Sequence, residues 1–148
     1  MLINNYFQNL NSTLSQIDKE SIKNSVYLIK NKVENNKKII TCGNGGSAYT
    51  SSHYITDWNK SYNLATGGNF KGFSLCDNYG LLTAYANDIS YDDAFTGQLK
   101  NIGEEEDLLI VVSGSGNSTN VLRCIKLAKS MGITTLSFVG YDGGECLK

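Results

Sequence analysis

The chain has 148 residues, of which 41% are hydrophobic and 18% are charged, and its formal net charge is −1. This length and composition are typical of one globular domain with a real hydrophobic core. The near balance of 13 basic and 14 acidic residues gives no electrostatic case for nucleic acid or a membrane surface as a partner.

Residues 1–36 predict a pair of N-terminal helices. Apolar residues recur every three or four positions in the first helix, at Ile3, Phe7, Leu10, Leu14 and Ile17. Asp18 is a plausible N-cap for the second helix, and the pair Asn35-Asn36 ends it.

Residues 37–148 alternate between strand and helix patterns. The expected strands cover 38–42, 72–76, 108–112 and 133–139, and the expected helices cover 47–60, 78–86, 92–100 and 119–131. Residues 62–71 read as a loop. This alternation predicts βαβ units, and therefore an α/β fold in which helices cover both faces of a parallel sheet.

The last residues, 143–148, resemble the first turn of a helix. A parallel strand normally needs a covering helix and often a further strand. We therefore expect the sequence to stop short of the full domain, with a last strand and helix missing.

The four cysteines show no CxxC spacing, and two of them lie in or beside apolar runs. This usage predicts reduced packing cysteines in a cytoplasmic protein. No apolar run approaches the roughly 20 residues that a membrane span needs, and no signal segment opens the chain.

The most informative stretch is 108–118, where five apolar residues run directly into Ser113-Gly114-Ser115-Gly116-Asn117-Ser118. We call residues 113–118 the serine loop. Hydroxyls and backbone N–H groups before a helix can hold a phosphate, and ligands of parallel sheets bind at the carboxyl ends of strands. A flexible turn is the alternative. The loop lacks the P-loop lysine and is not GxGxxG, which disfavours a nucleotide site.

A second loop, Gly43-Asn44-Gly45-Gly46-Ser47, follows its own strand. We call residues 43–47 the glycine loop. Its glycines let backbone approach a ligand closely, and Asn44 and Ser47 could contact sugar hydroxyls or phosphate. A tight turn with Ser47 as the N-cap of the next helix is compatible with that role.

His53 and Asp57 lie four residues apart on the following helix, and so on one face of it. Such a pair can ligate a metal or transfer protons, or it can be a simple surface hydrogen bond. Asn87-Asp88, taken alone, is typical of a helix end. Tyr91 and Trp58 are interpreted as packing residues.

Four ordered blocks together resemble the sugar isomerase (SIS) domain family. They are GNGGSAYTSSHYITD at 43–57, AND at 86–88, SGSGNSTNVLRCIKLAKSMG at 113–132 and YDGG at 141–144. Within the family, the chain is most similar to the members that interconvert D-sedoheptulose 7-phosphate and D-glycero-D-manno-heptose 7-phosphate. That step leads to nucleotide-activated heptose for lipopolysaccharide or capsule.

The resemblance implies a single SIS domain with a flavodoxin-like (Rossmann-like) αβα sandwich, and a homotetramer with sites shared between subunits. It also implies roles for particular residues. Ser113, Ser115 and Ser118 would grip the phosphate, with help from the Gly114 backbone. Asn44, Gly45, Gly46, Asn87 and Asp88 would line the sugar, with Ser47 nearby. His53 and Asp57 would be zinc ligands, and Asp57 also an acid/base group.

Two departures from the family pattern stand out. Asp57 replaces a glutamate and is one methylene shorter, and small misplacements of a catalytic group can cost much rate. The family's further essential Gln and His, and with them the remaining zinc ligands, are expected beyond Lys148. The alternative to an isomerase is a non-catalytic SIS module, either a phosphosugar sensor or a partner of a replication initiator.

Overall fold

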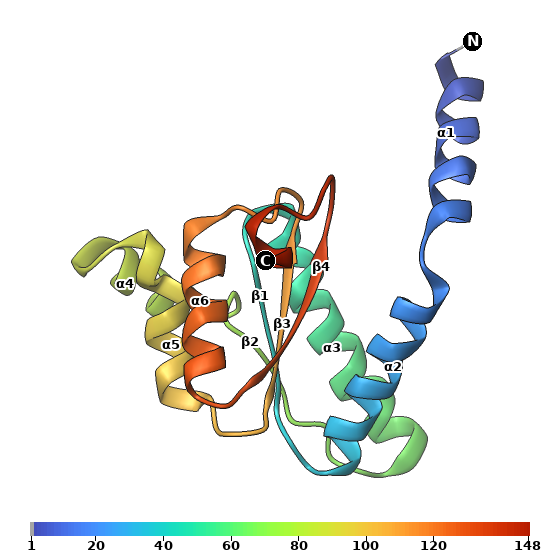
Figure 1. Cartoon of the computed structure of the whole chain (residues 1–148). Coiled ribbons are helices and arrows are strands. Elements are labelled where there is room, and N and C mark those ends of the chain that lie inside the picture. Colours follow the sequence, from blue (N-terminus) through green and yellow to red (C-terminus); the bar gives the residue numbers. More distant parts are fainter. Residues whose placement is uncertain (1) are drawn as a thin grey trace.

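A computed structural model describes residues 2–148 as a parallel sheet between two layers of helices (Figure 1). The helices are α1 (Leu2–Gln16), α2 (Lys19–Glu34), α3 (Gly46–Thr66), α4 (Tyr79–Asp88), α5 (Ala94–Ile102) and α6 (Thr119–Ser130). The strands are β1 (Ile39–Gly43), β2 (Gly72–Ser74), β3 (Leu108–Ser113) and β4 (Thr134–Val139). Two short 3₁₀ helices, η1 (Tyr91–Asp93) and η2 (Gly144–Leu147), complete the order.

The sheet has the strand order β2-β1-β3-β4, and every pair is parallel. This order is the first part of the flavodoxin-like order 2-1-3-4-5. The predicted α/β sandwich is therefore confirmed. β1 and β3 are central neighbours in register, with Gly43 opposite Val112, so the loops that follow them leave the sheet side by side.

The two faces of the sheet bury different sets of side chains, because residues along a strand alternate between faces. One face carries Ile40, Leu109 and Val111 against the buried sides of α5 and α6. The other carries Ile39, Leu108 and Ile110 against Ile55 of α3 and partly buried residues of α2. Figure 1 shows α5 and α6 on one side of the strands and α2 and α3 on the other.

The N-terminal helices form as expected, but they do not pack as a pair. Asp18 caps α2 by accepting a hydrogen bond from the Glu20 N–H at 3.0 Å, and Asn35 is its C-cap. α1 extends away from the sheet (Figure 1), and none of its residues is buried. Its apolar stripe is therefore open to solvent in the single chain, with Phe7 56% exposed and Leu10 40%.

The predicted helix over 47–60 is too short, because α3 continues to Thr66 and absorbs the first part of the expected loop. It ends only at Gly67, which takes the left-handed conformation with φ 68°. Nothing before Gly67 breaks the helix, since residues 60–66 contain neither glycine nor proline. β2 is shorter than expected and ends at Ser74.

All four cysteines are free, and Cys42, Cys76 and Cys124 are buried, which agrees with the packing interpretation. A hydrogen bond with Cys124 and burial both raise the pKa of the Cys42 thiol well above its usual range. Such a thiol is unreactive. Within residues 2–148, no helix is long and apolar enough to cross a membrane.

Candidate functional site

The serine loop links β3 to α6 and leaves several hydrogen-bonding groups uncommitted. The Ser113 hydroxyl accepts from the Gly116 N–H at 3.1 Å, and the Ser115 hydroxyl accepts from the Asn117 N–H at 3.2 Å. Both hydroxyls keep their own O–H to donate. Among the residues that the structure describes, none accepts a hydrogen bond from the N–H groups of Ser115, Ser118 and Thr119.

Ser118 is the N-cap of α6, yet its side chain makes no capping hydrogen bond. An N-cap serine normally accepts a hydrogen bond from the N–H of the second or third helical residue. Here the N–H of Val121, the third residue, is taken at 3.0 Å by the side-chain oxygen of Asn120. The Ser118 hydroxyl is therefore available for a ligand at the positive end of the helix dipole.

The segment after β4 closes one side of the serine loop. The Cys146 N–H donates to the Gly116 carbonyl at 3.0 Å, and the Glu145 N–H donates to the Asn117 side chain at 2.9 Å. Gly116 has φ 65° and lies directly against the Gly143 carbonyl, where a Cβ would clash. Gly144 of the YDGG block is just as close, because a Cβ there would clash with the Ser115 carbonyl and the Asn117 side chain.

The glycine loop is a tight turn of defined type. Gly45 has φ 53° and ψ −123°, and the Ser47 N–H donates to the Asn44 carbonyl at 2.9 Å. These are the features of a type II′ turn, whose first central position is dominated by glycine. The N-cap of α3 is Gly45 and not Ser47, so the expectation of a Ser47 cap is wrong. The turn places the cap two residues earlier.

The glycine loop contacts the first turn of α6, the helix that follows the serine loop. The side-chain amides of Asn44 and Asn120 exchange two hydrogen bonds, of 2.8 and 2.9 Å. The Tyr91 hydroxyl donates to the Asn44 side-chain oxygen at 2.8 Å. A cavity of about 160 Å³ lies beside this contact and is lined by Gly43, Gly45 and Tyr91, among others. Each loop follows the carboxyl end of its strand, as expected, and the two strands, β1 and β3, are neighbours in the sheet.

Asn120 and Tyr91 were missed by the sequence interpretation. Tyr91 is half exposed and reaches the glycine loop through its hydroxyl, so packing is not its main role. The sequence feature that could have indicated Asn120 is its position as the second residue of the helix that follows the serine loop. Trp58 does pack: it stacks on Tyr54 with ring centroids 5.1 Å apart.

Asn87 and Asp88 are the last two residues of α4, and both are exposed. The Asn87 amide donates to the Asp88 carboxylate at 2.8 Å. No hydrogen bond among the described residues joins either side chain to the two loops. Tyr91, three residues after Asp88, is the point where this segment contacts the glycine loop.

His53 and Asp57 form the expected pair on α3. The His53 Nε2 atom lies 2.9 Å from the Asp57 Oδ2 atom, and the side chains are 71% and 52% exposed. Imidazole and carboxylate are suitable zinc donors, but a zinc site needs at least three protein ligands. Residues 2–148 contain no cluster of three or more His, Cys, Asp or Glu side chains that could hold a metal. The pair alone therefore does not make a zinc site.

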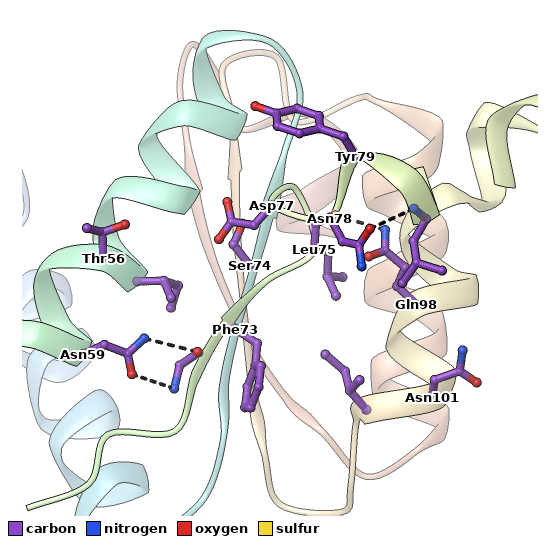
Figure 2. A pocket seen from close by; sticks show the side chains of 14 residues that line it. Thr56, Asn59, Phe73, Ser74, Leu75, Asp77, Asn78, Tyr79, Gln98 and Asn101 are labelled. Atoms are coloured by element: carbon purple, nitrogen blue, oxygen red, sulfur yellow. Dashed lines mark hydrogen bonds between the residues drawn. The ribbon is translucent and has the colours of Figure 1, made fainter. Parts of the chain in front are cut away.

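A larger cavity, of about 680 Å³, opens beside β2 and contains none of the predicted site residues (Figure 2). Several of its polar side chains make hydrogen bonds that hold the fold. The Asn59 side chain contacts both the N–H and the carbonyl of Gly72, at 3.4 and 3.2 Å. The Gln98 amide donates to the carbonyls of Leu75 and Ala94, and Asn78 caps α4. We therefore place the candidate site at the two loops.

Comparison with known proteins identifies the family of the chain. The SIS domain family matches residues 5–140, and the chain therefore belongs to the SIS domain family. It is 43% identical over 126 residues to a phosphoheptose isomerase of Helicobacter pylori (strain P12), with 85% of this chain and 65% of the relative covered. A phosphoheptose isomerase of Clostridium acetobutylicum is 39% identical over 126 residues, with 85% and 64% covered.

Solved structures give the same result for the fold. The chain superimposes on phosphoheptose isomerase GmhA from Neisseria gonorrhoeae with a TM-score of 0.88 and 26% identity, over 99% of this chain and 77% of that one. A phosphoheptose isomerase from Francisella tularensis gives a TM-score of 0.86 at 24% identity, over 98% and 76%. The chain spans just under two thirds of the length of the curated relatives it matches.

Proposed function

We propose that the chain is the sugar-phosphate-binding part of a phosphoheptose isomerase, which interconverts D-sedoheptulose 7-phosphate and D-glycero-D-manno-heptose 7-phosphate. The observation that carries this proposal is the serine loop. Its uncommitted Ser118 hydroxyl and unpaired N–H groups lie at the N-terminus of α6, beside the glycine loop. The relatives at about 40% identity support the same activity.

In this proposal the serine loop binds the phosphate. Ser113, Ser115 and Ser118 donate their hydroxyls, and the Gly114 backbone lies beside them. Arg123 is tied at 2.8 Å to Asp93, so the phosphate is held by hydroxyls, N–H groups and the helix dipole and not by an arginine. The glycine loop, with Asn87 and Asp88, lines the sugar.

Asp57 is the proposed base. An aldose–ketose isomerisation removes a proton from the carbon beside the carbonyl, forms an enediolate and returns the proton to the neighbouring carbon. With its proton on Nε2, His53 donates to Asp57 Oδ2 and leaves Oδ1 to take the substrate proton. His53 therefore holds the carboxylate in one orientation.

Zinc at His53 and Asp57 is a separate proposal, because the described residues supply two donors and no third. When bound, zinc would polarise the sugar oxygens. Zinc content of the purified protein and of a His53→Ala variant tests it. A stoichiometric zinc that persists in the variant would contradict the assignment of His53.

We also propose that the protein is a homo-oligomer. The apolar stripe of α1 is exposed in the single chain, and an isolated helix of this length is marginal in water without packing. Covering the stripe with a second copy of the chain would remove this exposure.

The isomerase proposal is tested by incubating the protein that contains this chain with sedoheptulose 7-phosphate in D₂O. Deuterium incorporation beside the carbonyl, followed by aldose formation, is the expected result. Binding of the sugar phosphate without any deuterium incorporation would favour a non-catalytic SIS module. The absence of both binding and exchange would overturn the proposal.

A further inference from the structure

Three side chains from separate parts of the chain meet above the ends of β1 and β3. Asn44 comes from the glycine loop, Asn120 from the first turn of α6, and Tyr91 from η1. The Asn44 and Asn120 amides exchange hydrogen bonds of 2.8 and 2.9 Å, and the Tyr91 hydroxyl donates to Asn44 Oδ1 at 2.8 Å. We call Asn44, Asn120 and Tyr91 the amide clasp.

The orientation of both amides is fixed by a backbone group. The Val121 N–H donates to Asn120 Oδ1 at 3.0 Å, so the Asn120 side chain must present its oxygen to the helix. Its NH₂ group then faces Asn44 Oδ1, and Asn44 must in turn present its NH₂ group to Asn120 Oδ1. A flip of either amide would place donor against donor. Asn120 is 2% exposed, so water does not compensate such a flip.

The hydrogen-bonding capacity of Asn44 is almost used up by the clasp. Its Oδ1 atom accepts from both Asn120 and Tyr91, and one of its two N–H groups donates to Asn120. One N–H remains. The Asn44 side chain can therefore act on a ligand only as the donor of a single hydrogen bond.

Asn120 has a second effect, at the N-terminus of α6. It takes the Val121 N–H, which is the group that an N-cap serine would ordinarily accept from. Within residues 2–148, the Asn120 N–H, at the second helical position, carries no hydrogen bond, and the Ser118 side chain makes no capping bond to it either. One buried amide thus orients the glycine loop and occupies one backbone donor at the N-terminus of α6.

We infer that Asn120, supported by Tyr91, is a positioning residue: it fixes the Asn44 side chain as a single-hydrogen-bond donor to the sugar. The inference rests on the proposed function for its ligand. Of the clasp residues, Tyr91 lines the cavity of about 160 Å³, together with Gly43 and Gly45 of the glycine loop.

The test uses Tyr91→Phe and Asn120→Ala, each made alone and in an Asn44→Ala background, in the protein that contains this chain. Tyr91→Phe removes only the hydroxyl of a half-exposed side chain, so the fold is expected to persist. Asn63→Ala is the matched control, because the Asn63 amide donates to the Gly68 carbonyl at 3.1 Å far from both loops.

Three readouts are measured. Tyr91→Phe is expected to lower kcat/KM for sedoheptulose 7-phosphate about fivefold, the effect of one neutral hydrogen bond, and to have no further effect once Asn44 is alanine. Asn120→Ala is expected to lower kcat/KM more than Tyr91→Phe does, because it removes both amide hydrogen bonds of Asn44, and both variants are expected to leave the binding of inorganic phosphate unchanged. The side-chain NH₂ signals of Asn44 in ¹H–¹⁵N spectra shift in Tyr91→Phe and not in Asn63→Ala.

The outcomes separate this inference from the proposed function. An equal loss of kcat/KM from Tyr91→Phe with and without Asn44 would overturn the clasp and leave the isomerase proposal standing. Unmoved Asn44 signals in Tyr91→Phe would also overturn it. A wild-type protein that turns over no sugar phosphate, but shows the expected signal shift and phosphate-binding pattern, contradicts the isomerase proposal and supports the clasp.

Discussion

His53 and Asp57 face each other across one turn of α3, with Nε2 and Oδ2 2.9 Å apart, and both remain open to solvent. A base that must meet a sugar needs this accessibility, and the histidine restricts the directions in which the carboxylate can point. The pair therefore gives the most direct test of chemistry in this chain.

Asp57→Asn should lower turnover of sedoheptulose 7-phosphate by at least about 100-fold, because a positioned general base contributes 10²–10⁴-fold. Binding of inorganic phosphate should not change, since Asp57 lies outside the serine loop. Glu34→Gln, an exposed carboxylate on α2 that pairs with Lys30, is the control and should retain full turnover. Unchanged turnover in Asp57→Asn would exclude Asp57 as the base.

Ser118→Ala should weaken phosphate binding without destabilising the protein. Its side chain makes no capping bond, so the change in the free energy of unfolding should stay within about 0.5 kcal/mol. Asn78→Ala provides the contrast, because Asn78 caps α4 through a bond from the Leu81 N–H at 3.0 Å and its loss should cost about 1 kcal/mol. Urea unfolding and phosphate titration measure the two effects. Destabilisation by Ser118→Ala equal to that of Asn78→Ala would contradict a free hydroxyl.

Gly116→Ala should destabilise the protein by more than about 1 kcal/mol, because alanine is strained at positive φ and its Cβ would clash with the Gly143 carbonyl. Gly114→Ala, in the same loop, should be nearly neutral, since nothing lies within 4 Å of a Cβ there. Thermal unfolding of both variants checks the difference. Equal stability of the two would show that the segment after β4 does not close on the serine loop.

Acid should weaken the contact between η1 and α6. A hydrogen bond from the Arg123 guanidinium holds the pKa of Asp93 below its usual value of 3.8. A carboxyl whose pKa is lowered by folding stabilises the protein above its unfolded pKa, and loses that contribution as the pH falls through the folded pKa. Arg123→Gln should therefore flatten the decline of stability below about pH 4, near the usual aspartate pKa. Urea midpoints measured across this range test it, and an unchanged slope would contradict the assignment.

Leu10→Glu should dissociate the proposed oligomer, because it places a charge on the exposed apolar stripe of α1. Gln8→Glu adds the same charge on the opposite side of the helix and should leave the assembly intact. Sedimentation velocity distinguishes the two. An oligomer that survives Leu10→Glu would show that another surface holds it together.

Much of this architecture follows from local patterns. The alternation of apolar runs and helical periodicity was sufficient to predict the parallel sandwich. The apolar runs are strands buried on both faces of the sheet, such as Leu108–Ser113. The placement of both loops followed because parallel strands end at one edge of a sheet. The end of α3 was missed, since only Gly67 stops the helix and residues 62–66 carry no breaker.

The amide clasp could not be predicted in the same way. Asn44 and Asn120 are 76 residues apart, and nothing local indicates that their side chains meet. Tyr91 resembles any other half-exposed aromatic residue until its hydroxyl is placed next to Asn44. Asn87 and Asp88 show the reverse case, because their local pattern correctly indicated a helix end, while their expected contact with the sugar stays a prediction.

The Asn59 side chain has a consequence for how this sheet can grow. The residues that flank β2 bond to β1 through the Lys71 carbonyl and the Leu75 N–H, so the backbone groups of Gly72 point outward, and Asn59 covers both of them. An unpaired edge invites other chains to add a strand there. At β2 an incoming strand would first have to displace a side chain that already mimics a neighbouring backbone. Extension of the sheet is therefore directional, and a further strand would pair more readily with β4.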